Sequence, residues 1–399
     1  MKKSYRSYSG RKYGSSYRSR RGYSGGYGRN KSRKTPVIIL SVLLAAAAGA
    51  LGVCYGLGLI GSGSRNNKAV TGPEKTSQAP EPAASKTEES SGAAEKKELK
   101  GTFDGNVFVY DKQGYEIFYG SREAAADYAK TVSELKKSLG SGVNVYSMVV
   151  PTHGYYGLPE KYKKQGSDEK ASIKKIYDSV GKDVKTIDVT GALEKHKDEY
   201  IYFRTDTNWT ALGAYYAYRE FCAAADLKPA PAGDMEKGKI DNFRGSLYYS
   251  TVTDENEKGN QILKNNPDTV NYYKLGAGCK CKLLERGEEK EKEMPMMAEM
   301  AQGQYAYSVF IWGDNPYMDI KTGLDTGRKL CIIKDSFGCA FAPFTSLNFD
   351  EIFVADPRYY QGNIREYIKK NNFTDVLILD SVMTANTGIR TDELKDITK

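Results

Sequence analysis

Residues 35–64 carry no charged side chain, and this gap in the charge pattern restricts the organisation of the chain more than any other feature. As a helix rising about 1.5 Å per residue, its apolar core, Val37 to Ile60, is long enough to cross a hydrocarbon layer about 30 Å thick. A cleaved signal peptide is the alternative, because Ala45 to Ala48 would offer small residues to a peptidase, but the stretch is longer than a usual signal core. We therefore predict a single transmembrane anchor at residues 35–61.

The segments on both sides of the predicted anchor are polar. Residues 1–34 hold twelve Lys or Arg, six Tyr and no acid. Such a segment cannot bury a core, and basic segments stay in the cytoplasm, so we predict a disordered cytoplasmic tail, an anchor in the cell membrane and an exported C-terminal part. Contact with RNA is the alternative for interleaved Arg and Tyr, but the anionic inner leaflet explains the charge more simply, so no nucleic-acid partner is predicted. Residues 62–100, rich in Ser, Ala, Pro, Glu and Lys, predict a flexible extracellular linker.

Residues 101–399 alternate short apolar runs with amphipathic stretches. The pattern predicts helices over residues 121–139, 173–180, 210–225 and 362–371, a hairpin over 106–119, and strands over 143–150, 184–189, 307–312, 330–333, 351–355 and 375–379. Residues 230–305 predict an excursion with local β-structure and a solvated charged loop. Strands that alternate with helices predict an α/β domain with a mostly parallel sheet covered on both faces, and ligands then bind at the C-terminal ends of the strands.

The stretch from Lys329 to Phe344 predicts a buried strand that meets a helix at the corner Asp335-Ser336. A serine on such a turn points away from the sheet edge, and the free backbone N–H groups of the helix start lie beside it. Acyl-transfer enzymes use this geometry for a nucleophile and its oxyanion hole, so Ser336 is a candidate nucleophile. The alternative is that Ser336 only caps the helix.

Four separated blocks carry a family resemblance. They are Asp206-Thr207-Asn208-Trp209, Phe243 to Leu247, Lys334-Asp335-Ser336-Phe337 and Asp356-Pro357-Arg358-Tyr359. Their order and content resemble the DHHW protein family, which is named for an Asp-His-His-Trp stretch and is similar to the SGNH-like acetyltransferases that O-acetylate alginate. The resemblance implies a three-layer α/β fold of the SGNH-hydrolase type, with Ser336 as the nucleophile, Asp206 as the orienting acid and Trp209 as the closing tryptophan.

The resemblance also implies a histidine base at position 208, where this chain has Asn208. Asparagine cannot titrate, and loss of the base from such a set costs about 10⁴-fold or more in rate. The chain has two histidines, and His196 lies among charged residues at a predicted helix end. His153 directly follows a predicted strand and is the candidate replacement base, with a structural hydrogen bond as the alternative.

Several residues near the Asp206 block are suited to binding substrate. Arg204 can contact a carboxylate or phosphate, and Trp209, Tyr202 and Tyr248 offer flat faces suited to sugar rings. Packing in the core is the alternative for these aromatic residues. No metal site or cofactor is predicted, because the one close cysteine pair, Cys279 and Cys281, does not have the spacing of a zinc knuckle.

Together these observations predict a membrane-anchored, outward-facing protein that acts on or binds a cell-envelope polysaccharide. If it is an enzyme, it is an O-acetyltransferase or acetylesterase that works through Ser336 with a degraded triad, and a membrane-bound partner supplies the acyl group. The alternative is a catalytically inactive glycan-binding or assembly subunit, a pseudoenzyme, for which Asn208 is the chief argument.

Overall fold

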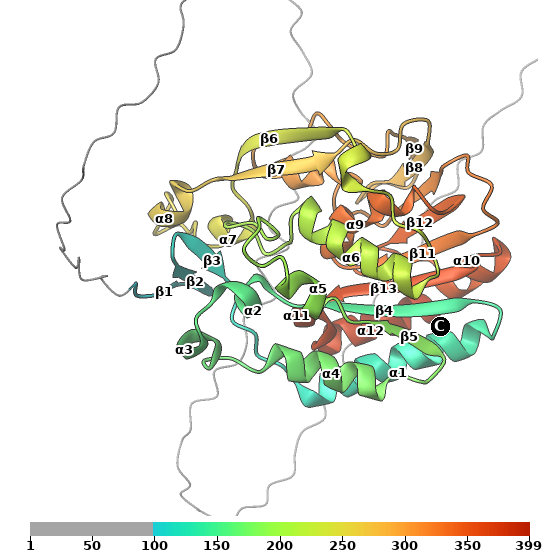
Figure 1. Ribbon diagram of the computed structural model, residues 1–399, viewed down its shortest axis with the longest axis horizontal. Helices are drawn as coiled ribbons and strands as arrows, with labels where there is room; N and C mark the ends of the chain where they lie inside the picture. The colour runs from blue at the N-terminus through green and yellow to red at the C-terminus, as the bar shows by residue number, and fades with distance from the viewer. Residues whose placement is uncertain (1–98) are drawn as a thin grey trace, which may run out of the picture. The chain divides into compact units, whose positions relative to one another are not determined.

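The computed structural model describes residues 99–399, and an eight-stranded mixed sheet lies at their centre (Figure 1). Five neighbouring strands run parallel, and three further strands extend one edge with alternating direction. In spatial order the strands are β5 (Val184–Ile187), β4 (Asn144–Val150), β13 (Asp375–Ser381), β11 (Lys329–Lys334), β12 (Glu351–Ala355), β10 (Tyr317–Lys321), β8 (Lys280–Leu284) and β9 (Lys292–Glu293). The predicted α/β domain with a mostly parallel sheet is confirmed.

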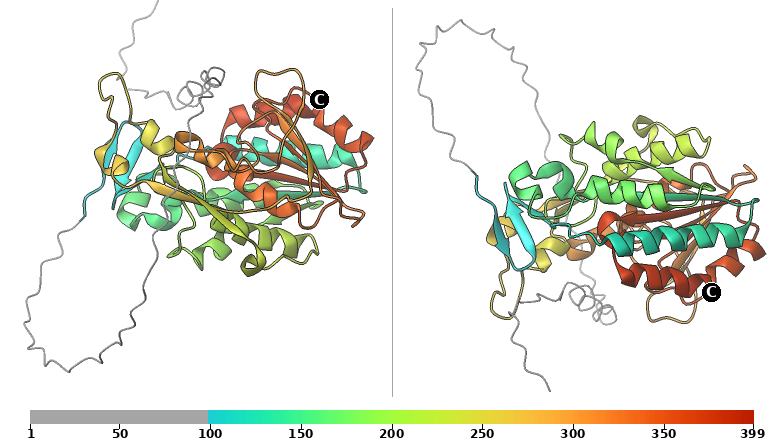
Figure 2. Two further views of the ribbon diagram at one scale, coloured as in Figure 1. Left: turned by 90° about the horizontal axis from the view of Figure 1, so that it is seen from above. Right: turned by 90° about the horizontal axis from the view of Figure 1, so that it is seen from below.

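Helices cover both faces of this sheet, as the views from above and below show (Figure 2). The longer helices are α1 (Arg122–Leu139), α4 (Glu169–Ser179), α6 (Ala211–Ala224), α9 (Phe337–Thr345), α10 (Ile364–Lys370) and α12 (Gly388–Thr398). The short ones are α2 (His153–Gly157), α3 (Glu160–Lys163), α5 (Thr190–Glu194), α7 (Ser246–Tyr249), α8 (Gln261–Lys264), α11 (Val382–Ala385) and the 3₁₀ helices η1 (Ala232–Asp234) and η2 (Gly303–Val309).

The period-two alternation of β11 explains the layers. Leu330 and Ile332 point into the core shared with α6 and α9, whereas Cys331 and Ile333 point into the core shared with α1, α4, α10 and α12. Because successive side chains of a strand face opposite sides, the apolar run of β11 from Leu330 to Ile333 needs a helical layer on each face. The result is three layers, helices–sheet–helices.

Two predicted helices begin where their capping residues stand. The side chain of Ser121 accepts a hydrogen bond from the Ala124 N–H at the start of α1, and the side chain of Thr210 accepts one from the Gly213 N–H at the start of α6. At the other end of α1, Gly140 has a φ of 82°, a conformation that favours glycine.

The predicted hairpin is present but shorter than expected. In a small sheet, β1 (Thr102–Asp104) pairs with β2 (Val107–Tyr110), and β2 pairs with β3 (Gln113–Tyr115). Asp111 and Lys112, with φ values of 45° and 63°, form the mirror-image turn that suits a hairpin. The prediction of a second strand over residues 115–119 is wrong, because β3 ends at Tyr115.

Within residues 230–316 one predicted element is wrong. The first half of the apolar run predicted as a strand over residues 307–312 lies in the 3₁₀ helix η2, and Ile311 and Trp312 have positive φ values of 46° and 66° that no strand allows. The strand that pairs with β12 on the side away from β11 is β10 instead. The expected local β-structure is present as the two-stranded sheet of β6 (Lys237–Phe243) and β7 (Asp268–Tyr273).

The predicted basic tail, the membrane anchor over residues 35–61 and nearly all of the linker lie outside the described residues. Among residues 99–399, no helix is both long and apolar enough to cross a membrane.

Candidate active site

Ser336 lies on the turn between β11 and α9, at the C-terminal end of a parallel strand. It is half-buried, whereas every other residue from Leu330 to Ser346 is buried. Its hydroxyl makes no capping hydrogen bond to the helix that follows. The alternative that Ser336 only caps the helix is therefore wrong.

Asp335 holds the turn instead. Its carboxylate accepts the Phe337 N–H at 3.0 Å and the Ser381 N–H at 2.8 Å, which ties the turn to the end of β13. Its carbonyl oxygen accepts the Gly338 N–H at 3.0 Å, and the Ser336 carbonyl accepts the Cys339 N–H at 3.1 Å. The N–H groups of residues 337–339 are thus engaged, so the expectation that they are free to receive negative charge is wrong.

A buried ion network supports the same turn from inside the domain. The Lys334 side chain is only 1% exposed, and its Nζ lies 2.7 Å from Asp314 and 3.0 Å from Asp356. Arg358 pairs with both carboxylates. Burial alone would lower the pKa of Lys334, but the carboxylates of Asp314 and Asp356 raise it above its usual value. Two of the four sequence blocks therefore meet around one buried ammonium group.

The first turn of α9 packs against Lys334 and requires glycine at position 338. A Cβ added to Gly338 would lie 2.4 Å from the Cβ of Lys334, which is far inside any normal contact. The absence of a side chain lets the first turn of the helix sit directly on the end of β11.

Asp206 and Asn208 form the second half of the candidate site and are both buried. Asp206 Oδ1 accepts the backbone N–H of Asn208 at 2.9 Å and its side-chain Nδ2 at 2.8 Å, and Oδ2 accepts the Ser246 N–H at 2.7 Å. A Cβ on Gly245 would lie 2.2 Å from Asp206 Oδ2, so glycine allows this loop to approach the carboxylate. Because the carboxylate accepts the amide N–H, Asn208 Oδ1 points elsewhere, and it has no partner among the described residues.

Two hydrogen bonds join the Ser336 turn to distant segments, one of them the Asp206–Trp209 block. Trp209 Nε1 donates to the Phe337 carbonyl at 2.9 Å, and the Tyr307 hydroxyl donates to the Ser336 carbonyl at 2.8 Å. Burial, then the Cys339 thiol and the carboxylate of Asp206, raise the pKa of Tyr307 well above its usual value, so the hydroxyl keeps its proton. The structure therefore brings the Asp206–Trp209 block against the Ser336 turn.

The candidate substrate-binding residues are mostly engaged in packing. Trp209, Tyr202 and Tyr248 are buried, and the Tyr202 and Tyr248 hydroxyls donate to the carbonyl oxygens of Pro151 and Lys258. This arrangement favours the packing alternative for the three aromatic side chains. Arg204 remains partly exposed, but it donates to the Pro267 carbonyl at 2.9 Å and lies 3.5 Å from buried Asp268.

His153 is held between two tyrosine rings. Its ring centre lies 4.6 Å from that of Tyr115 and 5.3 Å from that of Tyr202, and its buried Nδ1 has no partner among the described residues. Burial lowers the pKa of His153 to about 4. Among residues 99–399, no hydrogen bond or ring contact links it to Ser336, Asp206 or Asn208.

Glu116 is a residue of this region that the sequence analysis missed. It follows β3, is half-buried and forms no ion pair or hydrogen bond through its carboxylate with another described residue. Burial, followed by the carboxylates of Asp206, Glu169 and Asp335, raises the pKa of Glu116 to about 7. The only local signal is one acid inside an apolar run, Tyr115-Glu116-Ile117-Phe118.

Neither a metal site nor a disulfide is formed in the part of the chain that the structure describes. No group of three or more His, Cys, Asp or Glu side chains there could hold a metal ion, and the five cysteines within residues 99–399 are free thiols.

Comparisons with other proteins agree with the resemblance of the four blocks. A family model described as DHHW protein matches residues 62–355. The crystal structure of a DHHW family protein from Eubacterium siraeum is 34% identical with a TM-score of 0.66, over 74% of this chain and 96% of that one. PatB1 from Bacillus cereus shares the fold at 16% identity, with a TM-score of 0.59 over 75% of this chain and 100% of that one, and has also been solved with a sulfonyl adduct. The comparison with curated proteins gives no match. The chain belongs to the DHHW protein family.

Proposed function

We propose that this protein is a membrane-anchored, extracellular SGNH-like acyltransferase or esterase that acts on the O-acetyl groups of a cell-envelope polysaccharide. The observation that carries the proposal is the Ser336 turn. One half-exposed serine without a capping role stands in an otherwise buried stretch, and the geometry of the turn is fixed by Asp335, Gly338 and the Lys334 network. A nucleophile needs this combination of access and rigid support.

In the proposed reaction, Ser336 Oγ bonds to the acyl carbon of an ester donor, and the bond from that carbon to the donor's leaving oxygen breaks. A sugar hydroxyl or water then attacks the acyl-serine, and the serine oxygen leaves. Each half needs a group that takes a proton from the attacking hydroxyl and returns it to the leaving oxygen. Asn208 cannot do this, so Asp206 and Asn208 orient the site.

Glu116 suits the proton transfer better than His153, the replacement base proposed from the sequence. A general base works best when its pKa is near the working pH, and the pKa of Glu116 is about 7 whereas that of His153 is about 4. The carboxylates of Asp206 and Asp335, one from each half of the candidate site, also act electrostatically on Glu116.

The second candidate function is a catalytically silent glycan-binding or assembly subunit. It is supported by the Asp206–Asn208 hydrogen bonds, which satisfy the carboxylate without an imidazole. The predicted anchor at residues 35–61 and the linker at 62–100 would hold either kind of protein at the outer face of the membrane, beside a membrane-bound acyl donor.

Purified full-length chain in detergent tests the proposal when it is given a chromogenic acetyl ester and its mass is followed. Turnover and an acetyl group on Ser336, both lost in Ser336→Ala and kept in the control Ser179→Ala on an exposed helix end, support the enzyme. Loss of the pH-dependent rate in Glu116→Gln, with little change in His153→Ala, identifies the base. If neither the wild type nor any variant shows turnover or acetyl-serine, the protein is the catalytically silent subunit instead.

A further inference from the structure

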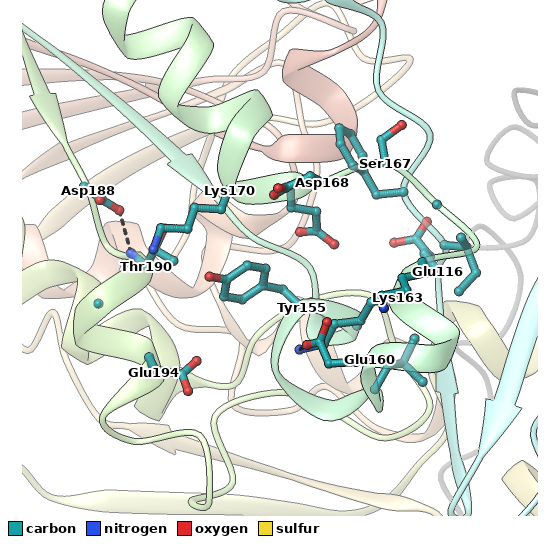
Figure 3. Close-up of a pocket in the computed structure, with 18 residues that line it drawn as sticks. Glu116, Tyr155, Glu160, Lys163, Ser167, Asp168, Lys170, Asp188, Thr190 and Glu194 are labelled. Atoms are coloured by element: carbon teal, nitrogen blue, oxygen red, sulfur yellow. Dashed lines mark hydrogen bonds and ion pairs between the residues drawn. The ribbon is translucent and has the colours of Figure 1, made fainter.

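A cavity of about 890 Å³ shares Glu116 with the candidate active site, and its other lining residues have no part in the reaction described above (Figure 3). Its walls come from α2, α3, the start of α4, the residues after β5 and the start of α5, with Glu116 on the remaining side. Its size is in the range of cavities that enclose a small ligand.

The cavity shares the sheet edge of Ser336. It sits over the C-terminal ends of β4 and β5, and only β13 separates β4 from β11 in the sheet. Two strand spacings are about 10 Å. The residue that closes β13, Ser381, donates its N–H to Asp335 next to Ser336, and Glu116 belongs to both the cavity wall and the surroundings of Asp335. The cavity and Ser336 therefore lie at the same end of the sheet, about two strand spacings apart, a distance that a ligand longer than one ring can span.

Tyr155 offers a binding surface inside the cavity. Figure 3 shows its ring pointing into the middle of the space, between the side chains of Lys170, Glu160 and Glu194. The ring is half-buried, Lys163 Nζ lies 5.5 Å from its centre, and its hydroxyl makes no hydrogen bond to another described residue. A flat face and a free hydroxyl, with carboxylates nearby as acceptors, are groups that bind the face and the hydroxyls of a sugar ring.

The charge of the cavity limits which sugar fits. Six acidic side chains and three lysines line it, a formal excess of three negative charges. Burial, then the carboxylates of Glu194, Asp168, Glu169 and Asp188, raise the pKa of Tyr155, so negative charge surrounds the ring. A ligand with acidic groups would meet like charge in a partly desolvated space, which costs binding energy, whereas an amino group would be attracted.

We propose that this cavity is the sugar subsite of the candidate active site and that it takes a neutral or amino-bearing sugar unit and rejects uronate units. The inference rests on the proposed function, since a glycan must be the partner, but it adds the location and the charge class. In this proposal Tyr155 stacks on the ring, and the carboxylates of Glu194 and Asp168 on the cavity wall accept hydrogen bonds from a sugar amine or hydroxyl.

The test is calorimetric titration of the full-length chain in detergent with three hexasaccharides, made of glucosamine, N-acetylglucosamine or uronic acid. We expect the glucosamine hexamer to bind at least as tightly as the N-acetylated one, and the uronate hexamer at least tenfold more weakly than both. Equal or tighter binding of the uronate hexamer would overturn the proposal.

Variants locate the binding. Tyr155→Ala is expected to weaken glucosamine-hexamer binding at least tenfold, and Tyr155→Phe, which keeps the ring, only a few-fold. Glu194→Gln is expected to weaken the amino hexamer more than the N-acetylated one. Tyr305→Ala, on an exposed tyrosine outside the cavity wall, is the control. Unchanged affinity in both Tyr155 variants would place the sugar elsewhere and contradict the subsite.

The subsite and the proposed function can fail separately. Ser336→Ala is expected to bind the hexamers like the wild type while losing ester turnover. Turnover through Ser336 without hexamer binding in the cavity would reject the subsite alone. Hexamer binding that depends on Tyr155, with no acylation of Ser336, would support the subsite and reject the enzyme.

Discussion

Two groups of buried or half-buried charges lie near the C-terminal ends of the parallel strands, and they differ in pairing. Behind the Ser336 turn, Lys334 and Arg358 share the carboxylates of Asp314 and Asp356. On the cavity side, Glu116 and Glu169 form no ion pair with a described residue, although Glu169 accepts two hydrogen bonds from Thr152. Burial is the leading cause that raises the pKa of each to about 7. The comparison teaches that pairing decides what a buried charge does: paired charges hold the turn in one ionisation state, and unpaired carboxylates titrate near neutral pH.

Of the changes predicted here, replacement of Lys334, the central cation of the first group, should have the largest effect. Lys334→Met leaves Asp314 and Asp356 buried with only Arg358 as a partner, so we expect the free energy of unfolding to fall by about 3–5 kcal/mol. Urea denaturation followed by circular dichroism measures the change. Lys329→Met on the same strand is the matched control, because its ion pair with Glu351 is partly exposed and its loss should cost about 1 kcal/mol or less. Similar losses in the two variants would contradict the comparison.

Removal of a carboxylate from the second group should have the opposite effect and stabilise the protein at high pH. A carboxyl whose pKa rises from 4.5 to about 7 on folding binds more protons in the folded state, so stability falls as pH rises between these values. Glu116→Gln removes this loss, and we expect it to raise the free energy of unfolding by about 1–3 kcal/mol at pH 8 and to leave it unchanged at pH 4.

Chemical denaturation at the two pH values measures this effect, with the exposed Glu257→Gln as the control. Glu116→Gln that destabilises the protein at pH 8 would mean that the carboxylate has a partner in solution and would remove it from the unpaired group.

The pH profile of ester turnover should show the smallest effect. If Glu116 accepts the proton, the rate should rise about tenfold from pH 6 to pH 8 as a group with a pKa of about 7 loses its proton. In Glu116→Gln the remaining rate should be flat over this range, and His153→Ala should keep the slope. A slope that disappears in His153→Ala instead would restore the histidine as the base.

Much of the fold follows from local sequence signals. The apolar run of β11 and the caps Ser121 and Thr210 place their elements within one or two residues. The strand predicted over residues 307–312 failed because a short apolar run does not distinguish a strand from an irregular buried segment, and here Tyr307 bonds to the Ser336 turn.

The candidate site was only partly predictable for a related reason. The Ser336 turn and the Asp206 block are contiguous motifs, so the sequence shows them. Glu116 enters the site through the tertiary path of β3, whose Gly114 N–H donates to the Arg204 carbonyl at 2.8 Å, and no local pattern encodes that contact. The burial of Trp209 and the position of His153 between Tyr115 and Tyr202 are likewise set by packing between distant segments.

The acylation rate of Ser336 in the Asn208→His variant tests the central claim most directly, namely that Ser336 and the Asp206–Asn208 pair form one catalytic cleft. Mass spectrometry of the peptide that contains Ser336, after timed exposure of the full-length chain to an acetyl ester, gives this rate. If position 208 faces the serine, the histidine should raise the rate by about 10²-fold, and the gain should vanish when Asp206→Asn is added. An unchanged rate in a folded Asn208→His protein, or acetylation of another residue instead of Ser336, would contradict the account.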